Sequence, residues 1–326
     1  MIDKIREFEV DGRKLMHIFK DIDVSEKEGK VYVTLGYEEA GQFKERAVKQ
    51  ELMKYLKMDL GYAGAKITFK DIAQEEIMKN SLLNQDGVFY LLVSSGKGGV
   101  GKSNVSANLA NLFNDKGYKV ALIDCDIYGS SIPGIFGIQK YPTLEDNNIL
   151  HPAIVDGINI VSVDFLMQAQ LPIMWRGPML GRALNHFFYY TKYEDDIEIV
   201  ILDLPPGTGD VALDIQQLVP HAKQVVVTTP HPTAANIAIK AGRMAEKMNH
   251  EVVGVIENMS YFVYEDKKLD IFGVGGGDMV ANTLNVPLLG KLEILPPKGE
   301  GLYSKDERNY QIYEDIVTKI IDKELI

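Results

Sequence analysis

The chain has 326 residues, a formal net charge of −11 and a single cysteine, Cys125. This length suits two domains, or one large α/β domain with an extension, and 46% hydrophobic with 25% charged residues is typical of a soluble globular protein. The acidic charge argues against a broad nucleic-acid-binding face, one cysteine excludes an intrachain disulfide, and no apolar run is long enough to span a membrane.

The first part of the chain, residues 1–85, is expected to form a small α+β domain. Residues 30–35 and 65–69 alternate as half-buried strands, and residues 43–56 have helical spacing. Residues 71–86 are polar with helical potential and are expected to link this domain to the rest. The first eight residues are charged without a signal-type apolar core, so we expect a cytoplasmic protein.

The remaining part, residues 86–326, alternates strands with helices. This order predicts an α/β fold with a mostly parallel sheet covered by helices on both faces, and the phosphate-binding loop described next makes the P-loop NTPase type the expected fold. Strands are expected at residues 88–93, 119–123, 158–163, 197–202, 224–229, 251–256 and 287–290, and helices at 103–115, 178–190, 210–218, 232–248, 277–284 and 309–323.

A phosphate-binding loop follows the first of these strands, because residues 96–103 read GKGGVGKS and match the pattern G-x-x-x-x-G-K-[ST]. Glycines allow successive backbone N–H groups to turn inward around phosphates. Lys102 is expected to reach the β- and γ-phosphates, and the Ser103 hydroxyl to bind Mg²⁺. The predicted nucleotide-binding residues are Gly96, Lys97, Gly98, Gly99, Val100, Gly101, Lys102, Ser103 and Asn104.

Lys97 is a second cation that an ordinary P-loop does not require. It follows the first glycine, where negative charge develops during phosphoryl transfer, so we assign catalytic roles to both Lys97 and Lys102. The alternative is a glycine-rich turn that binds nothing. The preceding strand and the following helix favour nucleotide binding, because a helix N-terminus attracts phosphate.

Three aspartates follow strands of the predicted sheet. Side chains just past the carboxyl ends of parallel strands face the ligand crevice. Asp126 is therefore predicted to position the attacking water, and Asp203 to support Mg²⁺ as a Walker B carboxylate, with Asp124 as a further Mg²⁺ candidate. The alternative for the 124–126 pair is a helix N-cap. The proline- and glycine-rich residues 204–210 are expected to change shape when the γ-phosphate leaves.

Two further segments lie near the end of the predicted sheet. Asn258 follows the strand at 251–256, and its amide can donate to and accept from a base edge, so we predict that it reads adenine. The alternative is an asparagine in a turn. The glycine run at 273–277 resembles a second phosphate loop but lacks the Lys-Ser/Thr pair, so we expect it only to open a helix.

These motifs carry a family resemblance. The loop with its extra Lys97 resembles the deviant Walker A group of P-loop ATPases, which includes the MinD and ParA families. Four further motifs make residues 89–321 resemble the Mrp/ApbC family of ATP-binding iron–sulfur cluster carriers; they are DCDIYG at 124–129, WRGPM at 175–179, DLPPGTGD at 203–210 and ENMSY at 257–261. Residues 1–85 are similar to the MIP18-like domain of such proteins, in a degenerate form.

The resemblance implies a slow ATPase that uses Mg²⁺ and works as a homodimer with the two nucleotide sites facing each other. Lys97 would then contact phosphates at the interface, much as an arginine finger does.

The chain departs from the family where cluster-carrying members have a Cys-x-x-Cys pair. Tyr264 and Lys267 stand at those positions, and neither ligates a cluster, so we expect no [4Fe–4S] cluster. We therefore expect a nucleotide-dependent switch, without cluster carriage, that acts on an unidentified protein partner. Two alternatives stay open: an iron–sulfur carrier with unconventional ligands or a partner's thiols, and an ATP-gated DNA-binding regulator whose DNA would bind a local basic patch.

Overall fold

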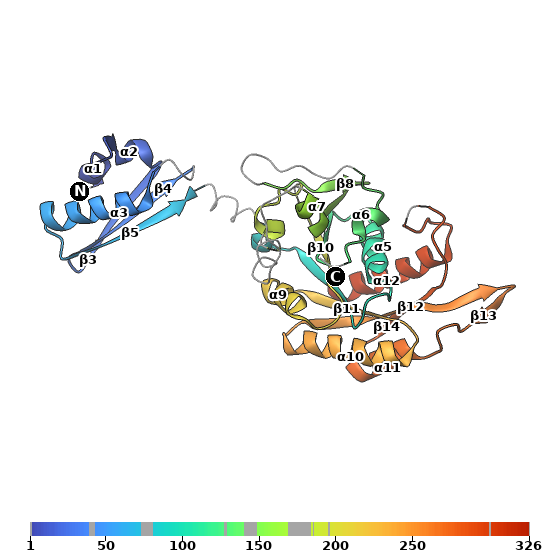
Figure 1. The fold of residues 1–326 in the computed structure, drawn as a ribbon. Coiled ribbons are helices and arrows are strands. Elements are labelled where there is room, and N and C mark those ends of the chain that lie inside the picture. Colours follow the sequence, from blue (N-terminus) through green and yellow to red (C-terminus); the bar gives the residue numbers. More distant parts are fainter. Residues whose placement is uncertain are drawn as a thin grey trace. The chain divides into compact units, whose positions relative to one another are not determined.

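The computed structural model describes residues 2–38, 43–72, 81–126, 129–139, 149–168, 184, 186–194, 196–299 and 301–325. The chain divides into two compact units, Met1–Asn80 and Ser81–Ile326 (Figure 1). Within the described ranges, no helix combines the length and the apolar character needed to cross a bilayer.

The first unit packs short helices on a small sheet. Its elements are α1 (Ile2–Arg6), β1 (Glu9–Val10), β2 (Arg13–Lys14), α2 (Leu15–Ile18), β3 (Asp21–Lys27), β4 (Lys30–Tyr37), α3 (Glu45–Lys54), a π-helical turn (Tyr55–Asp59) and β5 (Gly64–Asp71). In the sheet, β4 pairs antiparallel with β3 and parallel with β5. Alternate β4 residues, Val31, Val33 and Leu35, are buried in the core of this unit, as period-two spacing predicts. The strands and the helix expected in this part are all present, whereas α1, β1, β2, α2 and β3 were not predicted.

The second unit is built on a central sheet. In the described part of the chain it has nine strands, which are β6 (Phe89–Ser95), β7 (Val120–Asp124), β8 (Ala153–Val155), β9 (Ile158–Ser162), β10 (Ile199–Asp203), β11 (Lys223–Thr228), β12 (Glu251–Tyr264), β13 (Lys267–Leu269) and β14 (Leu288–Glu293). The strand order is β13-β12-β11-β6-β10-β7-β9-β8, with β14 also paired to β12. Only β8 and β13 pair antiparallel among these strands. The predicted α/β class with a mostly parallel sheet is confirmed.

Helices cover both faces of this sheet (Figure 1). They are α5 (Lys102–Asp115), α6 (Ile132–Ile135), α7 (Val163–Gln168), α9 (Asp210–Leu218), α10 (Pro232–Lys247), α11 (Gly276–Leu284) and α12 (Arg308–Glu324), besides a 3₁₀ turn at Leu82–Asn84. Neighbouring side chains of β6 point to opposite faces of the sheet. Leu91 packs in the hydrophobic cluster that contains α5 and α12, and Leu92 packs in the cluster on the other face. The short elements α6, α7 and β8 were not predicted. Residues 178–183 and 185 of the helix expected at 178–190 lie outside the described residues.

One expected strand end is wrong. The strand predicted at 251–256 continues to Tyr264 and forms a hairpin with β13 that extends beyond the sheet in Figure 1. Glu265 and Asp266 both have positive φ, 46° and 61°, which is the geometry of a tight two-residue hairpin turn. The sequence lacks the glycine or asparagine that normally marks such a turn, so the hairpin had no clear signal.

Candidate nucleotide site

The phosphate loop connects β6 to α5 at the carboxyl edge of the parallel strands. Gly99 and Gly101 both have φ of 79°, a left-handed conformation that glycine adopts without strain. A Cβ on Gly101 would lie 2.2 Å from Asn258 Nδ2, and one on Gly96 would lie 2.4 Å from the α10 backbone. The loop therefore needs these glycines both for its path and for close packing.

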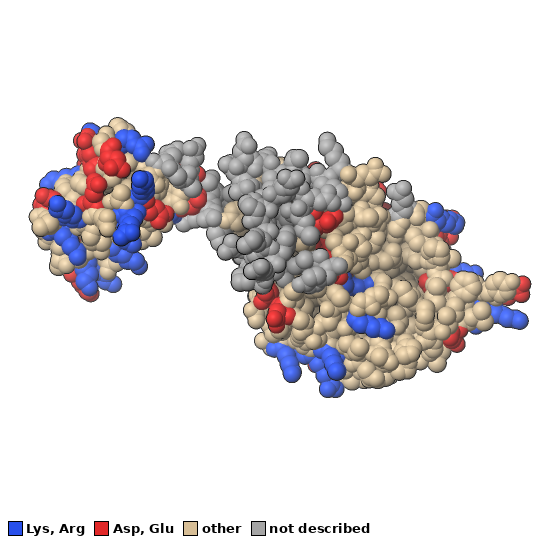
Figure 2. Space-filling model, viewed as in Figure 1, with Lys and Arg blue, Asp and Glu red and all other residues tan. Residues whose placement is uncertain are grey.

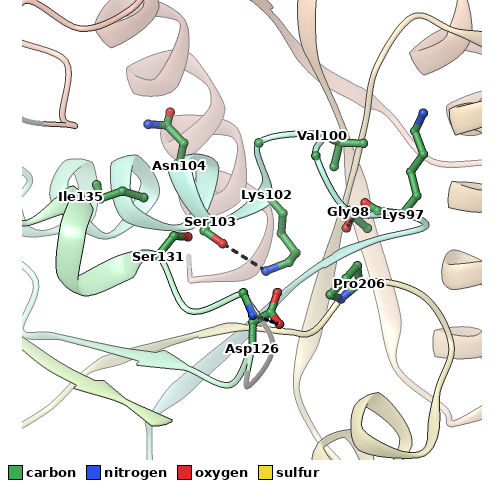
Figure 3. A pocket seen from close by; sticks show the side chains of 14 residues that line it. Lys97, Gly98, Val100, Lys102, Ser103, Asn104, Asp126, Ser131, Ile135 and Pro206 are labelled. Carbon is green, nitrogen blue, oxygen red and sulfur yellow. Dashed lines mark hydrogen bonds between the residues drawn. The ribbon is translucent and has the colours of Figure 1, made fainter. Parts of the chain in front are cut away.

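The loop lines a cavity of about 540 Å³. Its walls come from the loop itself, from Asp126, Gly129, Ser131 and Ile135 after β7, and from Pro206 after β10. Figure 3 shows Lys102, Ser103 and Asp126 converging on this space, with Pro206 beside them. The sequence did not single out Ile135, because a four-residue helix such as α6 gives no periodic signal.

The buried carboxylate of Asp203 connects the two nucleotide motifs. It accepts hydrogen bonds from Ser103 Oγ and Ser106 Oγ at 2.6 Å each, and pairs with Lys102 Nζ at 2.7 Å. Asp203 is fully buried and Lys102 is 5% exposed, so the pair is shielded from water. The predicted Walker A and Walker B residues thus lie together. Ser106 was not predicted, although its spacing of four from Lys102 places it on the same helix face.

Asp124 lies beside Asp203 in the parallel register of β7 and β10. Its carboxylate accepts hydrogen bonds from Ser130 Oγ at 2.8 Å, Ser162 Oγ at 3.1 Å and Asp126 N at 3.1 Å. Burial, and next the negative charge of Asp203, raises the pKa of Asp124 to about 6. Asp124 is not among the residues that line the cavity. Its geometry suits the positioning of Asp126, and its Mg²⁺ role stays a prediction.

Asp126 and Lys97 differ in how they face the cavity. Asp126 is 7% exposed, accepts a hydrogen bond from Gly129 N at 3.1 Å and lies below Lys102 in Figure 3. Lys97 is exposed, and Figure 3 shows its side chain extending away from Lys102. No hydrogen bond or ion pair of its ammonium is found within the described residues. Lys97 is therefore available for a ligand or partner outside this chain.

The two predicted asparagines hold the cavity's surroundings in place. Asn258 Nδ2 donates to the Val100 carbonyl at 2.9 Å, which ties β12 to the phosphate loop. Asn104 Nδ2 donates to the Gly301 carbonyl at 3.1 Å, and Asn108 accepts from Tyr303 N at 3.0 Å, so α5 holds the 301–303 segment. The reading of adenine by Asn258 stays a prediction.

The glycine run at 273–277 opens α11, as expected. The Glu257 carboxylate accepts from Gly277 N at 2.5 Å and occupies the N-terminus of this helix. A carboxylate therefore takes the position that a phosphate would need. Tyr264 and Lys267 face each other across the β12–β13 turn. Residues 127–128 and the 175–179 motif lie outside the described residues.

This geometry defines a P-loop NTPase with a mostly parallel sheet. A family model described as "ParA: NUBPL iron-transfer P-loop NTPase" matches residues 88–321, and the chain belongs to this family.

Named relatives agree with that assignment. An "Iron-sulfur cluster carrier protein" of Bacillus subtilis is 41% identical over 92% of this chain and 90% of its own length. A protein of the same name from Mycobacterium leprae is 44% identical over 211 residues. The match covers 63% of this chain and 55% of that relative.

Solved structures share the fold. A nucleotide-binding protein of Archaeoglobus fulgidus in complex with ADP superposes with a TM-score of 0.57 at 29% identity, covering 76% of this chain and 92% of that one. The cell division ATPase MinD of Pyrococcus furiosus gives 0.54 at 18% identity, covering 72% and 99%.

The contacts of Gly96 predict that alanine destabilises the fold more at this position than at Gly98. Gly96→Ala should lower the free energy of unfolding by roughly 1–3 kcal/mol, because the new methyl group meets the α10 backbone. Gly98→Ala is the control, since its Cβ would have Pro206 Cγ as its nearest neighbour, at 4.0 Å. Urea unfolding measures both. Equal stability of the two variants would contradict this packing.

The raised pKa of Asp124 predicts a pH dependence. Between its ordinary value of 3.8 and about 6, the folded chain binds more protons at this group than the unfolded chain does. The free energy of unfolding should therefore fall as pH rises through this window, by on the order of 1–3 kcal/mol.

Urea unfolding at several pH values, without nucleotide, measures how the free energy of unfolding depends on pH. Asp124→Asn should reduce this dependence between about pH 4 and 6. Asp322→Asn, at an exposed position of α12, is the control and should leave it unchanged. A slope that persists in Asp124→Asn would assign the effect to other groups.

Proposed function

We propose that this chain binds and hydrolyses ATP and acts as a nucleotide-dependent switch. The observation that carries this proposal is the cluster of Lys102, Ser103 and Asp203 at the base of the glycine loop's cavity. The Archaeoglobus fulgidus relative, named as a complex with ADP, supports nucleotide as the ligand. A switch is supported by the contact of the loop after Asp203 with the residue just before the phosphate loop, since Gly207 N donates to the carbonyl of Ser95, the last residue of β6, at 2.9 Å.

Phosphate binding would change the partner of Lys102. Its ammonium, now paired with Asp203, would move to the phosphate oxygens, and the amides of the glycine loop would donate to the same group. Ser103 and Asp203 present adjacent hard oxygen atoms, 2.6 Å apart, which fit Mg²⁺. When bound, Mg²⁺ would neutralise the phosphate charge that develops. Asp126 would orient the attacking water from the opposite wall.

We further propose a homodimer across the nucleotide site. The exposed Lys97 supports it, because in a facing copy this ammonium would reach the phosphates of the partner and stabilise developing charge. The cytoplasm is the proposed location, on the basis of one buried, unpaired cysteine.

Lysine and aspartate variants test the proposed roles. Lys102→Ala should raise the Kd for Mg–ATP more than tenfold, since it removes the ammonium that binds the phosphates. Lys97→Ala and Asp126→Ala should change the Kd little and slow hydrolysis on the order of a hundredfold. Calorimetry and phosphate release measure the two quantities.

The control for these variants is Lys247→Ala, at an exposed position on α10. Normal turnover by Lys97→Ala would remove Lys97 from the mechanism.

Iron–sulfur carriage is the second candidate, because the relatives from Bacillus subtilis and Mycobacterium leprae bear that name. The residues present do not fit a cluster. Burial and the neighbouring carboxylates raise the pKa of the Cys125 thiol, which disfavours the thiolate a cluster needs.

Anaerobic reconstitution separates the two functions. With iron and sulfide, the wild-type chain should show no cluster absorbance and less than stoichiometric iron. The Tyr264→Cys/Lys267→Cys variant is the positive comparison, because these residues face each other in the hairpin. A stoichiometric cluster on the wild-type chain would contradict the loss of cluster carriage.

A further inference from the structure

The outer face of α10 carries a row of basic side chains. Lys240, Arg243 and Lys247 are all exposed, and the exposed Asn236 continues the row one turn toward the start of the helix. At about 100° per residue these four positions fall within an arc of about 60°, so they share one face. The three cations extend over about 10 Å along the helix axis. These four side chains are here called the α10 stripe.

The cations of the α10 stripe have no acidic partner in the described part of the chain. No hydrogen bond or ion pair of Lys240, Arg243 or Lys247 side chains is found there. Elsewhere on the second unit, partly exposed cations do pair with carboxylates; they are Lys116, Lys223, Lys291, Lys298, Arg308 and Lys323. The α10 stripe is therefore free to pair with anionic groups of another molecule.

The stripe reverses the sign of charge that prevails in this unit. Residues 81–326 contain 20 Lys and Arg against 30 Asp and Glu. Figure 2 shows basic groups gathered along the lower edge of the second unit, where Figure 1 places α10. A row of unpaired cations on an acidic unit is a local feature that selects for an acidic partner.

The opposite face of α10 is buried and made of small side chains, which are Ala234, Ala235, Ala238, Ala241, Gly242 and Ala245. A Cβ on Gly242 would lie 2.3 Å from Leu284 Cδ1 of α11, so the helix packs closely. None of the large hydrophobic side chains that are exposed in the described ranges belongs to α10. This helix therefore offers charge, and no apolar surface, to a second molecule.

These features favour a protein segment over a membrane or a nucleic acid. A membrane-bound helix inserts an apolar face among the lipids, and the apolar face of α10 is already buried. A nucleic acid is a long polyanion, which the acidic remainder of the unit would repel beyond the short stripe. Glu246 is exposed about 60° from the edge of the stripe, so the surface there has mixed charge.

We propose that the α10 stripe docks an acidic segment of the partner protein that reads the nucleotide switch. The inference rests on the proposed function, and it names the surface and the chemistry of that partner. A partner helix with Asp or Glu at spacings of three and four residues would match Lys240, Arg243 and Lys247.

The docking helix is in direct contact with the phosphate loop. A Cβ on Gly96, the first glycine of that loop, would lie 2.4 Å from Ala238 N and from the Ile237 carbonyl carbon. The turn of α10 between Asn236 and Lys240 thus rests on the loop. A rearrangement of the loop on phosphate binding would therefore shift the stripe, and docking and nucleotide binding should influence each other.

Fluorescence anisotropy of the full chain with a synthetic peptide tests the stripe. The probe is a fluorescein-labelled, alanine-based helical peptide of about 16 residues with glutamate at spacings of three and four. It should bind the wild-type chain with a Kd that rises with salt, as surface ion pairs do. Lys240→Glu/Arg243→Glu should raise this Kd roughly tenfold or more, because two attractions become repulsions.

Lys192→Glu/Lys305→Glu is the matched control, because it changes the net charge equally at two exposed positions outside α10. A second peptide, with lysine in place of each glutamate, should bind Lys240→Glu/Arg243→Glu more tightly than it binds this control. That exchange of preference would exclude misfolding as the cause of lost binding. Equal binding of the acidic peptide to both double variants would overturn the docking surface.

Competition identifies the class of partner. A DNA duplex of about 20 base pairs and phosphatidylglycerol vesicles, at matched concentrations of negative charge, should displace the peptide less well than unlabelled peptide does. Better displacement by either competitor would assign the stripe to that polyanion and overturn the proposal.

Nucleotide separates the docking surface from the proposed function. The peptide Kd should change about threefold or more when a Mg²⁺-bound, non-hydrolysable ATP analogue is added. An unchanged Kd would contradict the reading of the switch through α10. A chain that hydrolyses ATP but binds the peptide independently of the stripe overturns the docking surface alone. A chain that binds the peptide through the stripe but does not bind Mg–ATP overturns the proposed function.

Discussion

The nucleotide site depends on one buried interaction, in which Asp203 holds Lys102 at 2.7 Å and accepts from two serine hydroxyls of α5. A buried ion pair is stable only when its remaining hydrogen-bonding capacity is satisfied, and Ser103 and Ser106 satisfy it here. The pair keeps the Lys102 side chain at the cavity, with its charge compensated. A triphosphate would offer Lys102 a more highly charged partner, and Asp203 would be released to support a metal ion.

The fold is what brings these groups together. In the parallel sheet, the P-loop leaves the carboxyl end of β6 between β10 and β11, and the register aligns Asp203 with Asp124 on the neighbouring strand. Two carboxylates thus lie side by side in the interior, and the raised pKa of Asp124 is the electrostatic consequence. Serine hydroxyls from the loop after β7 (Ser130) and from β9 (Ser162) donate hydrogen bonds to Asp124 and offset part of this cost.

Much of this arrangement could be predicted from the sequence, because it follows from local patterns. The alternation of strands and helices gave the fold class, and the glycine loop with Lys102, Ser103 and a strand-ending Asp203 gave the core of the site. The partners of these groups could not be predicted in the same way. Ser130 and Ser162 reach Asp124 through tertiary packing, and Asn258 bonds to a residue 158 positions away. The extended β12 was missed because its turn lacks the usual residues.

Nucleotide binding is expected to move the Lys102 ammonium from Asp203 to a phosphate. A structure of the chain crystallised with a Mg²⁺-bound, non-hydrolysable ATP analogue tests this transfer directly. The analogue should lie in the glycine loop, with Lys102 Nζ bonded to its phosphate oxygens and separated from Asp203 Oδ1. An analogue bound elsewhere, or a Lys102–Asp203 pair still at 2.7 Å beside a bound triphosphate, would contradict it.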